Sequence, residues 1–346
     1  MKAIQIRRAG GHEQLRLVEL PPPEPREGEV HVAIDAVGVN FADIAVRMGL
    51  YQSAKDYVGW PIIPGFEFSG TVRALGAGAQ GFSVGEPVFG VTRFGGYASE
   101  ISVPASQLFA RPPGWSSAEA AAFPTVYLTA WYALRELCKL RPGARVLVHS
   151  AAGGVGGALT RLAVACGASV VGTVGTPQKV AVAREAGAEH VVDKSQGAWH
   201  RQTRELVPQG FDVVLDAHGA DSLRHGYAQL APAGRLIVYG FHGLLTRGKD
   251  RPSYAKLLLG YLRTPRFNPF EMTQHNRAVL AFNLSYLFER GEILGEAMSE
   301  LLGWARDGRI RPPPVRTYPL HQAAHAHAAL ESGSSFGKLV LLTAEV

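Results

Sequence analysis

The stretch V-L-V-H-S-A-A-G-G-V-G-G-A-L at 146–159 decides the fold class of this chain. A short apolar run leads into a glycine turn, and the turn leads into residues with helical spacing. Glycine keeps such a turn tight, allows backbone N–H groups to approach a pyrophosphate, and allows the helix to pack on the sheet. The sequence therefore predicts that Gly153, Gly154, Val155 and Gly156 bind a dinucleotide at a helix N-terminus. A purely structural glycine turn is the alternative interpretation.

Apolar runs and helical segments alternate beyond this turn. The runs S-V-V-G-T-V-G, H-V-V-D, F-D-V-V-L-D-A and G-R-L-I-V-Y-G are separated by helix-like segments such as P-Q-K-V-A-V-A-R-E-A-G-A. Strands that alternate with helices of this length predict a doubly wound parallel sheet, which we place at 125–268. The first hundred residues are short apolar runs divided by glycine and proline, which predicts a β-rich region. A capped helix is expected to begin at Ser116, and the chain returns to an apolar run, G-K-L-V-L-L-T, near its C-terminus.

The composition limits the functional classes. A chain of 346 residues is long enough for two domains, and 47% hydrophobic with 18% charged residues is an ordinary globular balance. The formal net charge is +6, but lysine and arginine form no run of five or more residues, which argues against a nucleic-acid-binding stripe. There are two cysteines, Cys138 and Cys166, and neither a signal-peptide core nor a run of about 18 apolar residues occurs. We therefore expect a soluble, cytoplasmic protein without disulfides.

The segment after the second strand bears on the choice of dinucleotide. About 20 residues after the glycine turn, NAD enzymes place an acidic side chain on the ribose hydroxyls. Here Val174 and Gly175 supply no carboxylate, while Thr176 and Lys179 follow and Lys194 ends the next strand. The missing acid and the nearby lysines predict that Gly175, Thr176, Lys179 and Lys194 contact the cofactor and that the cofactor is NADPH. Solvated lysines at helix starts are the alternative.

Several motifs in one order carry a resemblance to a known family. G-V-N-F-A-D at 38–43, G-L-Y at 49–51 and P-G-F-E-F-S-G at 64–70, together with the glycine turn and G-T-V-G-T-P-Q-K, resemble the medium-chain dehydrogenase/reductase superfamily. Within it the chain is similar to the zinc-free quinone oxidoreductase group. F-P-T-V-Y-L-T-A-W-Y-A-L, L-I-V-Y-G-F-H-G-L-L-T-R-G and H-N-R-A-V-L-A-F-N-L-S-Y-L-F-E are most like the vesicle-amine-transport-protein-like branch.

The resemblance implies an α/β protein with two domains. A GroES-like, β-rich catalytic domain would be built from 1–124 and 269–346, and a Rossmann domain at 125–268 would be inserted between them. The active site would lie in the cleft between the two. Relatives are commonly homodimers that pair edge strands of their Rossmann sheets, so a homodimer is expected, with G-R-L-I-V-Y-G near such an edge.

The resemblance also argues against a metal. Metal-dependent relatives carry three zinc ligands, and the matching positions here are Asn40, Phe66 and Thr125. None of these is a good zinc ligand, so no metal is expected. Glu67 follows Phe66 between two phenylalanines, and burying its carboxylate there would be costly without partners. We expect a structural role in which Glu67 accepts hydrogen bonds, with an arginine as a candidate donor.

Histidines near the C-terminus are the other metal candidates. In H-Q-A-A-H-A-H-A-A, His321, His325 and His327 offer imidazoles, but only the first pair shares a helical face. No acid or cysteine nearby completes a site. All three are interpreted as surface residues of a helix.

The catalytic residues follow from the resemblance. Hydride transfer to a conjugated carbonyl needs alignment and donors for the developing enolate oxygen. Asn40 would hold the nicotinamide amide or a substrate carbonyl, and Tyr51 would donate its O–H to the same oxygen. Asp43 would orient its neighbours rather than donate a proton, because its ordinary pKa is near 4. As alternatives, Asn40 and Asp43 would cap a short helix, and Tyr51 would be an ordinary loop aromatic.

Further cofactor contacts are expected on later segments. Tyr239 and Gly240 end a predicted Rossmann strand, where backbone groups meet the nicotinamide end. Phe282, Asn283 and Lys338 match segments that contact cofactor in relatives. Core packing is the alternative for Phe282, and a surface cation is the alternative for Lys338.

The functional expectation is a zinc-independent, NADPH-dependent oxidoreductase that transfers hydride to quinones or α,β-unsaturated carbonyls. The alternative is a nucleotide-binding protein associated with membranes or lipids that has little turnover. The insert at 244–270 mixes apolar and basic residues. It suits peripheral membrane contact or a lid, although a loop packed on its own domain is the favoured interpretation.

Overall fold

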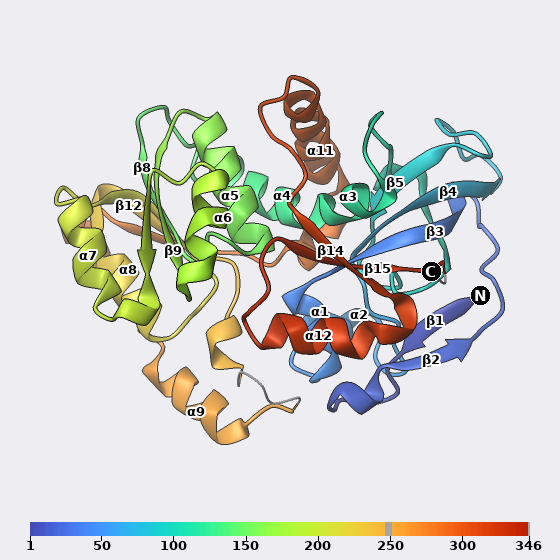
Figure 1. Cartoon of the computed structure of the whole chain (residues 1–346), viewed down its shortest axis with the longest axis horizontal. Coiled ribbons are helices and arrows are strands. Elements are labelled where there is room, and N and C mark those ends of the chain that lie inside the picture. The colour runs from blue at the N-terminus through green and yellow to red at the C-terminus, as the bar shows by residue number, and fades with distance from the viewer. Residues whose placement is uncertain (246–250, 345–346) are drawn as a thin grey trace.

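The computed structural model describes residues 1–245 and 251–344. Within them, one parallel sheet and one antiparallel-rich sheet lie side by side, with the parallel sheet at the left of Figure 1 and the other at the right. Both chain ends lie on the β-rich side. The predicted α/β class with a Rossmann-like part and a β-rich part is confirmed.

The parallel sheet forms because its strands are apolar on both faces. Val146, Leu147 and Val148 are completely buried, as expected for a strand that helices cover on both sides. The six strands run in the order β10-β9-β8-β11-β12-β13, which is the order of doubly wound dinucleotide-binding sheets. Helices α5 and α6 lie on one side and α7 and α8 on the other (Figure 1). The strands are β8 (Arg145–Val148), β9 (Ser169–Val174), β10 (His190–Asp193), β11 (Phe211–Asp216), β12 (Leu230–Val238) and β13 (Ala278–Ala281); the helices are α5 (Gly154–Ala165), α6 (Val180–Glu185), α7 (Trp199–Leu206) and α8 (Asp221–Ala228).

One predicted boundary needs correction. The Rossmann part was expected to end at 268, with 269–346 in the catalytic domain. However, β13 pairs with β12 in parallel register from Arg235↔Ala278 to Val238↔Ala281, so the sheet continues to Ala281. A four-residue run carries too little periodicity to reveal its sheet, and only the pairing partner does so. β12 accordingly lies one strand inside the edge that β13 forms.

The β-rich part joins the two ends of the chain. β15 pairs antiparallel with β3, so the C-terminal run completes a sheet begun near the N-terminus. The seven-stranded sheet has the order β14-β15-β3-β4-β5-β7, with β6 on β3, and β1 and β2 form a separate hairpin. The strands are β1 (Lys2–Gln5), β2 (Arg16–Glu19), β3 (Glu29–Val39), β4 (Glu67–Leu75), β5 (Pro87–Val91), β6 (Glu100–Pro104), β7 (Leu108–Ala110), β14 (Val315–Pro319) and β15 (Lys338–Leu342).

Helices fill the space between and around the sheets. The predicted cap at Ser116 is confirmed, because the Glu119 N–H donates to the Ser116 hydroxyl at 3.2 Å while the Glu119 carboxylate accepts from the Ser116 N–H at 2.9 Å. The helices are α1 (Phe41–Arg47), α2 (Gln52–Tyr57), α3 (Ser117–Ala122), α4 (Pro124–Trp131), α9 (Tyr254–Arg263), α10 (Pro269–His275), α11 (Gly291–Arg306) and α12 (Ala323–Glu331). Shorter turns are η1 (His12–Gln14), η2 (Ala105–Gln107), η3 (Tyr132–Leu137, a π-helix), η4 (Pro177–Lys179), η5 (Lys194–Gln196), η6 (His242–Leu244), η7 (Leu284–Glu289) and η8 (Leu320–Gln322).

The described residues of the insert at 244–270 are largely helical, so the favoured interpretation as a loop needs correction. The insert contributes α9 and the start of α10, and α9 lies at the lower left of Figure 1, below the parallel-sheet side. Gly260 is its buried contact point, since a Cβ there would lie 2.3 Å from Leu244 Cδ2. Its apolar side chains remain exposed, as described below. Residues 246–250 of the insert lie outside the described part of the chain.

Candidate cofactor and substrate site

The glycine turn lies where the sequence placed it, between β8 and α5. A Cβ on Gly156 would lie 2.1 Å from the Ser150 carbonyl oxygen, so only glycine allows the helix to approach the strand so closely. On Gly154 a Cβ would meet Val126 at 3.2 Å and the stem of Lys338 at 3.6 Å. Side chains at Gly154 and Gly156 would collide with or crowd their neighbours, whereas glycine leaves the backbone at the start of α5 uncovered. A dinucleotide pyrophosphate fits this cradle.

The C-terminal end of the chain borders the same turn. The Gly337 N–H donates to the Ala152 carbonyl at 3.0 Å, and Gly153 and Gly337 form an isolated parallel bridge. Because Lys338 follows directly, β15 delivers its side chain beside the glycine turn. This contact connects residues nearly two hundred positions apart.

The predicted 2′-phosphate region lies past β9 and β10. A Cβ on Gly175 would meet nothing within 4 Å, so space opens beyond β9. Lys179 Nζ donates to the Gly333 carbonyl at 2.5 Å, and Lys194 Nζ lies 2.7 Å from His218 Nε2. Both lysines are half-buried and bonded. Any phosphate contact would therefore require them to exchange or share these partners.

The nicotinamide end of the predicted site is lined by later segments. Tyr239 and Gly240 follow β12, and burial raises the pKa of Tyr239, so its phenol stays protonated. The Phe282 ring packs on Tyr132 with centroids 4.9 Å apart, which agrees with the packing interpretation for Phe282. Asn283 faces the catalytic part and accepts a hydrogen bond from Tyr51 at 2.8 Å.

Asn40, Glu67 and Lys338 form the buried centre of the site. Glu67 is completely buried and Lys338 is 3% exposed, and Lys338 Nζ lies 2.5 Å from Glu67 Oε1. Asn40 Nδ2 donates to the same oxygen at 2.9 Å, while Lys338 Nζ donates to Asn40 Oδ1. Glu67 therefore has the expected structural partners, but its cation is a lysine and not an arginine. The interpretation of Lys338 as a surface cation is wrong, because β15 lies inside the sheet.

Thr125 is a site residue whose functional potential the sequence reasoning missed. Its N–H donates to Glu67 Oε2 at 2.7 Å, which places it on the other side of the same carboxylate from Lys338. The Thr125 hydroxyl oxygen is buried, and no described residue hydrogen bonds to it. A buried hydroxyl without a partner is costly, so a ligand atom there would be favoured. The signal in the sequence was its match to a ligand position of metal-dependent relatives.

Asp43 connects two site loops. It is completely buried, and its carboxylate accepts from the Asn40 N–H at 2.8 Å and from the Gly65 N–H at 2.9 Å. Asn40 stands at the N-cap position of α1, so the capping interpretation of both residues is compatible with a place in the site. Burial raises the pKa of Asp43 to about 7, against the opposing effects of these N–H groups, Lys338 and Tyr97.

Tyr51 belongs to a contact between α2 and η7. Its O–H donates to Asn283, the Ser53 and Ser285 hydroxyls are 2.9 Å apart, and the Tyr286 O–H donates to an Asp56 oxygen at 3.0 Å. Burial raises the pKa of Tyr51, so its phenol remains a donor at neutral pH. Tyr51 lies in the loop that precedes α2, and its hydrogen bond to Asn283 joins two segments far apart in the sequence, so a role in the site remains a prediction.

The three former ligand positions meet around Glu67 but offer no metal site. Asn40 and Thr125 both bond to the Glu67 carboxylate, and the Phe66 ring packs against Tyr51 and Phe94 at centroid distances of 5.7 and 5.3 Å. An amide, a hydroxyl and a phenyl ring do not fit zinc. Within the described residues, no group of three or more metal-binding side chains occurs.

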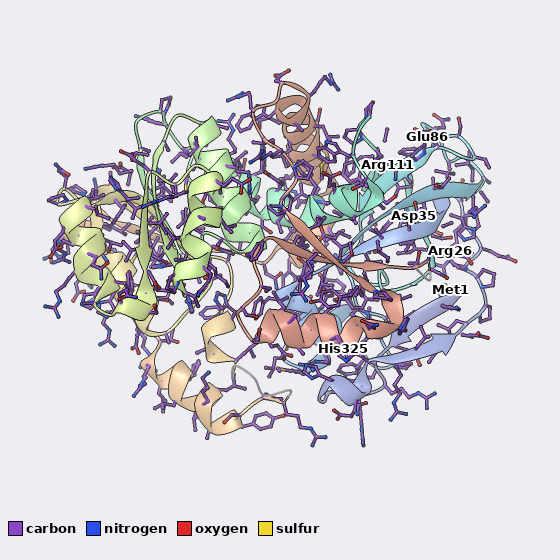
Figure 2. All side chains as sticks on the ribbon, in the orientation of Figure 1. Met1, Arg26, Asp35, Glu86, Arg111 and His325 are labelled. Carbon is purple, nitrogen blue, oxygen red and sulfur yellow. The ribbon has the colours of Figure 1, made fainter. Side chains whose placement is uncertain are left out.

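One of the three C-terminal histidines is not on the surface. His321 and His325 are exposed on or beside α12, where Figure 2 marks His325. His327 is completely buried, and its Nε2 lies 3.0 Å from the Tyr97 hydroxyl. The expectation fails for His327 because α12 packs against the seven-stranded sheet, and position 327 falls on the packed face.

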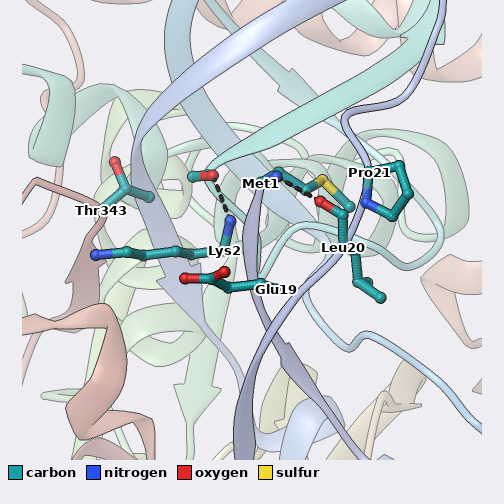
Figure 3. Close-up of a pocket in the computed structure, with 7 residues that line it drawn as sticks. Met1, Lys2, Glu19, Leu20, Pro21 and Thr343 are labelled. Atoms are coloured by element: carbon teal, nitrogen blue, oxygen red, sulfur yellow. Dashed lines mark hydrogen bonds between the residues drawn. The ribbon is translucent and has the colours of Figure 1, made fainter.

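A separate cavity lies away from these residues. Its volume is about 550 Å³, and it lies at the β1–β2 hairpin (Figure 3). None of the predicted site residues lines it; the lining residues are Met1, Lys2, Glu19, Leu20, Pro21, Ser99 and Thr343. In the part of the chain that the structure describes, no helix has the length and apolar character needed to cross a membrane.

Comparison with known proteins agrees with this architecture. Residues 26–113 match the alcohol dehydrogenase GroES-like domain family, and residues 186–341 match the zinc-binding dehydrogenase family. The synaptic vesicle membrane protein VAT-1 homolog of Danio rerio is 33% identical over 343 residues, covering 99% of this chain and 70% of that protein.

Two solved structures of quinone oxidoreductases are also similar. The enzyme from Pseudomonas syringae pv. Tomato DC3000 superposes with a TM-score of 0.86 at 29% identity, covering 99% of both chains. The Escherichia coli enzyme, solved with NADPH, gives 0.85 at 29% identity and covers 99% of this chain and 100% of that one. The chain therefore belongs to the medium-chain dehydrogenase/reductase superfamily and, within it, to the branch of the VAT-1 homologues.

Proposed function

We propose that this oxidoreductase transfers hydride from NADPH to quinones or α,β-unsaturated carbonyls without zinc. The observation that carries the proposal is the buried Asn40–Glu67–Lys338 cluster beside the glycine turn. The Lys338 ammonium and the Thr125 backbone N–H contact the two oxygens of the same Glu67 carboxylate, so a cation and the Thr125 hydroxyl lie close to this cluster. The solved quinone oxidoreductase neighbours support the same reaction class.

NADPH is the proposed cofactor. The cradle at Gly156 leaves room for a pyrophosphate, and residues 175–179, directly after β9, contain no acidic side chain to hold an unphosphorylated ribose. Lys179 ends the turn η4 after β9, and Lys194 directly follows β10, so both supply positive charge for a 2′-phosphate. The Escherichia coli neighbour was solved with NADPH.

The residues of the chain act mainly by alignment and charge. Bound NADPH supplies the hydride. Reduction of a conjugated carbonyl places negative charge on its oxygen, and fixed donors in a water-poor site stabilise that charge. The Thr125 hydroxyl has no partner among the described residues and donates to this oxygen, while the nearby Lys338 ammonium adds positive charge. Asn40 holds Lys338 and Glu67 in place.

Tyr51 and Asp43 have supporting roles. The Tyr51 phenol stays protonated, and it becomes available to the substrate when its bond to Asn283 is exchanged. Asp43 fixes the backbone of Asn40 and Gly65, so it orients the site and does not touch the substrate.

NADPH oxidation assays test the proposal. With 1,4-naphthoquinone, 9,10-phenanthrenequinone and trans-2-enals, we expect turnover above the rate without protein, unchanged after dialysis against a chelator. Thr125→Val removes the hydroxyl at constant shape and should lower kcat by about 10-fold or more, in the range of a lost oxyanion donor. Thr125→Ser keeps a hydroxyl and should retain most of the wild-type kcat. Thr129→Val is the matched control, because its hydroxyl is already bonded to the Thr125 carbonyl one turn away.

The assays also define failure. Absence of turnover with every acceptor, alongside retained NADPH binding, contradicts the reductase proposal. Equal activity of Thr125→Val and Thr129→Val removes Thr125 from the proposed mechanism.

A second candidate function is contact with an anionic membrane surface. The apolar side chains of the insert are exposed: Tyr254 by 73%, Leu258 by 61%, Tyr261 by 70%, Leu262 by 68% and Phe270 by 82%. Lys256, Arg263 and Arg266 lie within the same stretch. An apolar helix face with basic neighbours favours the interface of anionic lipids. The VAT-1 homologues are named as vesicle membrane proteins, which supports this candidate.

Vesicle sedimentation tests the second candidate. The protein should pellet with phosphatidylserine-containing vesicles more than with phosphatidylcholine vesicles. The double variant Tyr261→Ser/Leu262→Ser should pellet less, whereas Leu17→Ser/Val84→Ser, which changes two exposed apolar residues elsewhere, should behave as the wild type. Equal pelleting of both double variants would exclude α9 as the contact.

A further inference from the structure

Asp43 does more than cap α1. Its Oδ2 accepts from the Asn40 N–H and its Oδ1 accepts from the Gly65 N–H. One carboxylate therefore sets both the loop that carries Asn40 and the turn that leads to Glu67. Any change in the orientation of Asp43 moves two of the site's components together.

A buried chain connects Asp43 to α12. The Tyr97 hydroxyl lies 3.2 Å from Asp43 Oδ2 and 3.0 Å from His327 Nε2. Asp43, Tyr97 and His327 are all completely buried, and the Tyr97 and His327 rings meet edge to face at 5.8 Å. His327 Nδ1 has no hydrogen-bond partner among the described residues. The chain thus ends at His327, so the single hydrogen bond to Tyr97 fixes the orientation of its ring.

The protons of this chain can be assigned. When Asp43 is ionised it only accepts, so the Tyr97 O–H must donate to it. His327 Nε2–H then donates to the phenol oxygen, which in a neutral ring places the proton on Nε2 and leaves Nδ1 unprotonated. Burial lowers the pKa of His327 well below its usual value, and the positive charges of Arg47 and His12 lower it further. Each hydrogen bond from His327 on α12 through Tyr97 to the Asp43 carboxylate therefore has one donor and one acceptor.

Protonation of Asp43 breaks this arrangement. The pKa of Asp43 is raised to about 7 by burial, which the Asn40 N–H, Lys338, the Gly65 N–H and the Tyr97 O–H oppose. A protonated Oδ2 would be a donor, and it would face two donors at once. The hydrogen bonds of Asn40 and Tyr97 to that oxygen cannot then both persist.

Other charged groups around the chain are already paired. The Arg47 guanidinium and the His12 imidazole both contact Glu331, each at 2.5 Å. Glu67, which faces Tyr97 electrostatically, is paired with Lys338. Tyr51 faces Asp43 and remains a neutral phenol. These pairs leave Tyr97 as the one group that links Asp43 to α12 by hydrogen bonds among the described residues.

We propose that Tyr97 and His327 are positioning residues: through this hydrogen-bonded chain they hold the Asp43 carboxylate in the orientation that fixes Asn40 and Gly65 for the reaction. The proposal rests on the proposed reductase function, since it explains how that site is kept aligned. It adds a pH dependence that arises outside the substrate pocket.

The pH profile of kcat/KM is the first test. Tyr97→Phe removes one donor from the ionised Asp43, so the acidic limb of the profile should move upward by about one pH unit. His327→Leu should move it in the same direction, and His327→Gln, which keeps an N–H donor, should restore it. His325→Gln, on the exposed side of the same helix, should leave the profile unchanged. A uniform drop at every pH with an unmoved limb would assign Tyr97 a packing role and overturn the proposal.

Infrared spectroscopy supplies a readout that needs no turnover. The band of a protonated carboxylic acid that disappears in Asp43→Asn should titrate near pH 7 in the wild type and at higher pH in Tyr97→Phe. If the band shifts but the protein has no reductase activity, the proposed function is wrong, and the positioning role of Tyr97 and His327 is supported. If the band titrates at the same pH in the wild type and Tyr97→Phe, the positioning role of Tyr97 and His327 is contradicted, whatever the reductase activity. If Tyr97→Phe does not fold, His327→Leu takes its place in both measurements.

Discussion

Lys338 shows what a single buried residue contributes. Moving an ammonium and a carboxylate out of water is costly, and a buried pair is retained only when further hydrogen bonds complete it. Asn40 and the Thr125 N–H provide those bonds around Glu67. The sequence indicated a carboxylate in need of partners, but not that its cation comes from the last strand.

The first residue-scale prediction concerns this pair. Lys338→Met leaves Glu67 buried without its cation and should destabilise the protein by about 3–5 kcal/mol in urea unfolding. Glu67→Gln should affect folding or NADPH affinity more than the chemical step. The double variant should be more stable than the two single changes predict, because neither charge is then left alone. Additive losses would show that the pair contributes no coupling energy.

The second residue-scale prediction is a loss of stability in acid that originates at His149. His149 follows β8, its Nδ1 lies 3.0 Å from the Thr173 hydroxyl, and its Nε2 lies 3.8 Å from Asp216 Oδ2. Burial lowers its pKa from 6.5 to about 4, against the opposing effect of Asp216. The folded state therefore favours the neutral ring, and the stability it gives above pH 6.5 is lost as the pH falls toward 4. From pH 7 to pH 5 this loss should be about 2 kcal/mol.

Urea unfolding at pH 7 and pH 5 measures this loss in the free energy of unfolding. His149→Leu should remove about this much of the pH dependence, whatever its effect at pH 7. His190→Leu changes an exposed histidine at the start of β10 and serves as the control. Equal acid sensitivity in the wild type and His149→Leu would contradict the assignment.

At the scale of elements, the glycine turn is defined by how closely α5 approaches β8. Gly156 and Gly157 are neighbours in the sequence but differ in their surroundings. At Gly156 a Cβ would meet the Ser150 backbone at 2.1 Å, whereas at Gly157 it would meet the end of the Arg161 side chain at 3.1 Å. Backbone cannot move aside as a long side chain can.

The element-scale prediction compares these two positions. Gly156→Ala should force α5 away from β8, cost about 1–3 kcal/mol and weaken NADPH binding, because the start of the helix forms the cradle. Gly157→Ala should stay within about 1 kcal/mol of the wild type, since alanine also favours the helix. Thermal unfolding and fluorescence titration with NADPH measure both effects. Similar NADPH affinities for the two variants would argue against a cofactor role for the turn.

Across the whole molecule, β13 is an exposed apolar edge. The strand A-V-L-A contains no charge or proline, the usual protections of a free edge. We propose that two copies pair along this edge, which would join their parallel sheets into one. The Phe282 N–H donates to Val238 of β12, so by alternation the N–H groups of Val279 and Ala281 point to the free side.

The whole-molecule prediction follows from that alternation. Ala281→Pro removes an outward N–H without removing a bond to β12, and the Ala281 side chain is exposed. The wild type should sediment as a dimer and the variant as a monomer with an unchanged circular dichroism spectrum. Ala278→Ser, which leaves every N–H in place, is the control. A dimeric Ala281→Pro variant would place the interface elsewhere.

The sequence by itself determined the local features. Alternating apolar runs and helices, the glycine turn and the Ser116 cap are local patterns, and each appears where it was expected. The chemistry of Asn40, Phe66 and Thr125 argued against zinc for the same reason, since it depends only on residue type.

Only the tertiary structure decided which distant residues meet. The pairing of β15 with β3 brings Lys338 to Glu67, and the packing of α12 buries His327 against Tyr97. β13 joined the parallel sheet, and α9 kept its apolar face exposed. These outcomes depend on contacts between segments far apart in the chain, and no local pattern of hydrophobicity or spacing encodes the partner of such a contact.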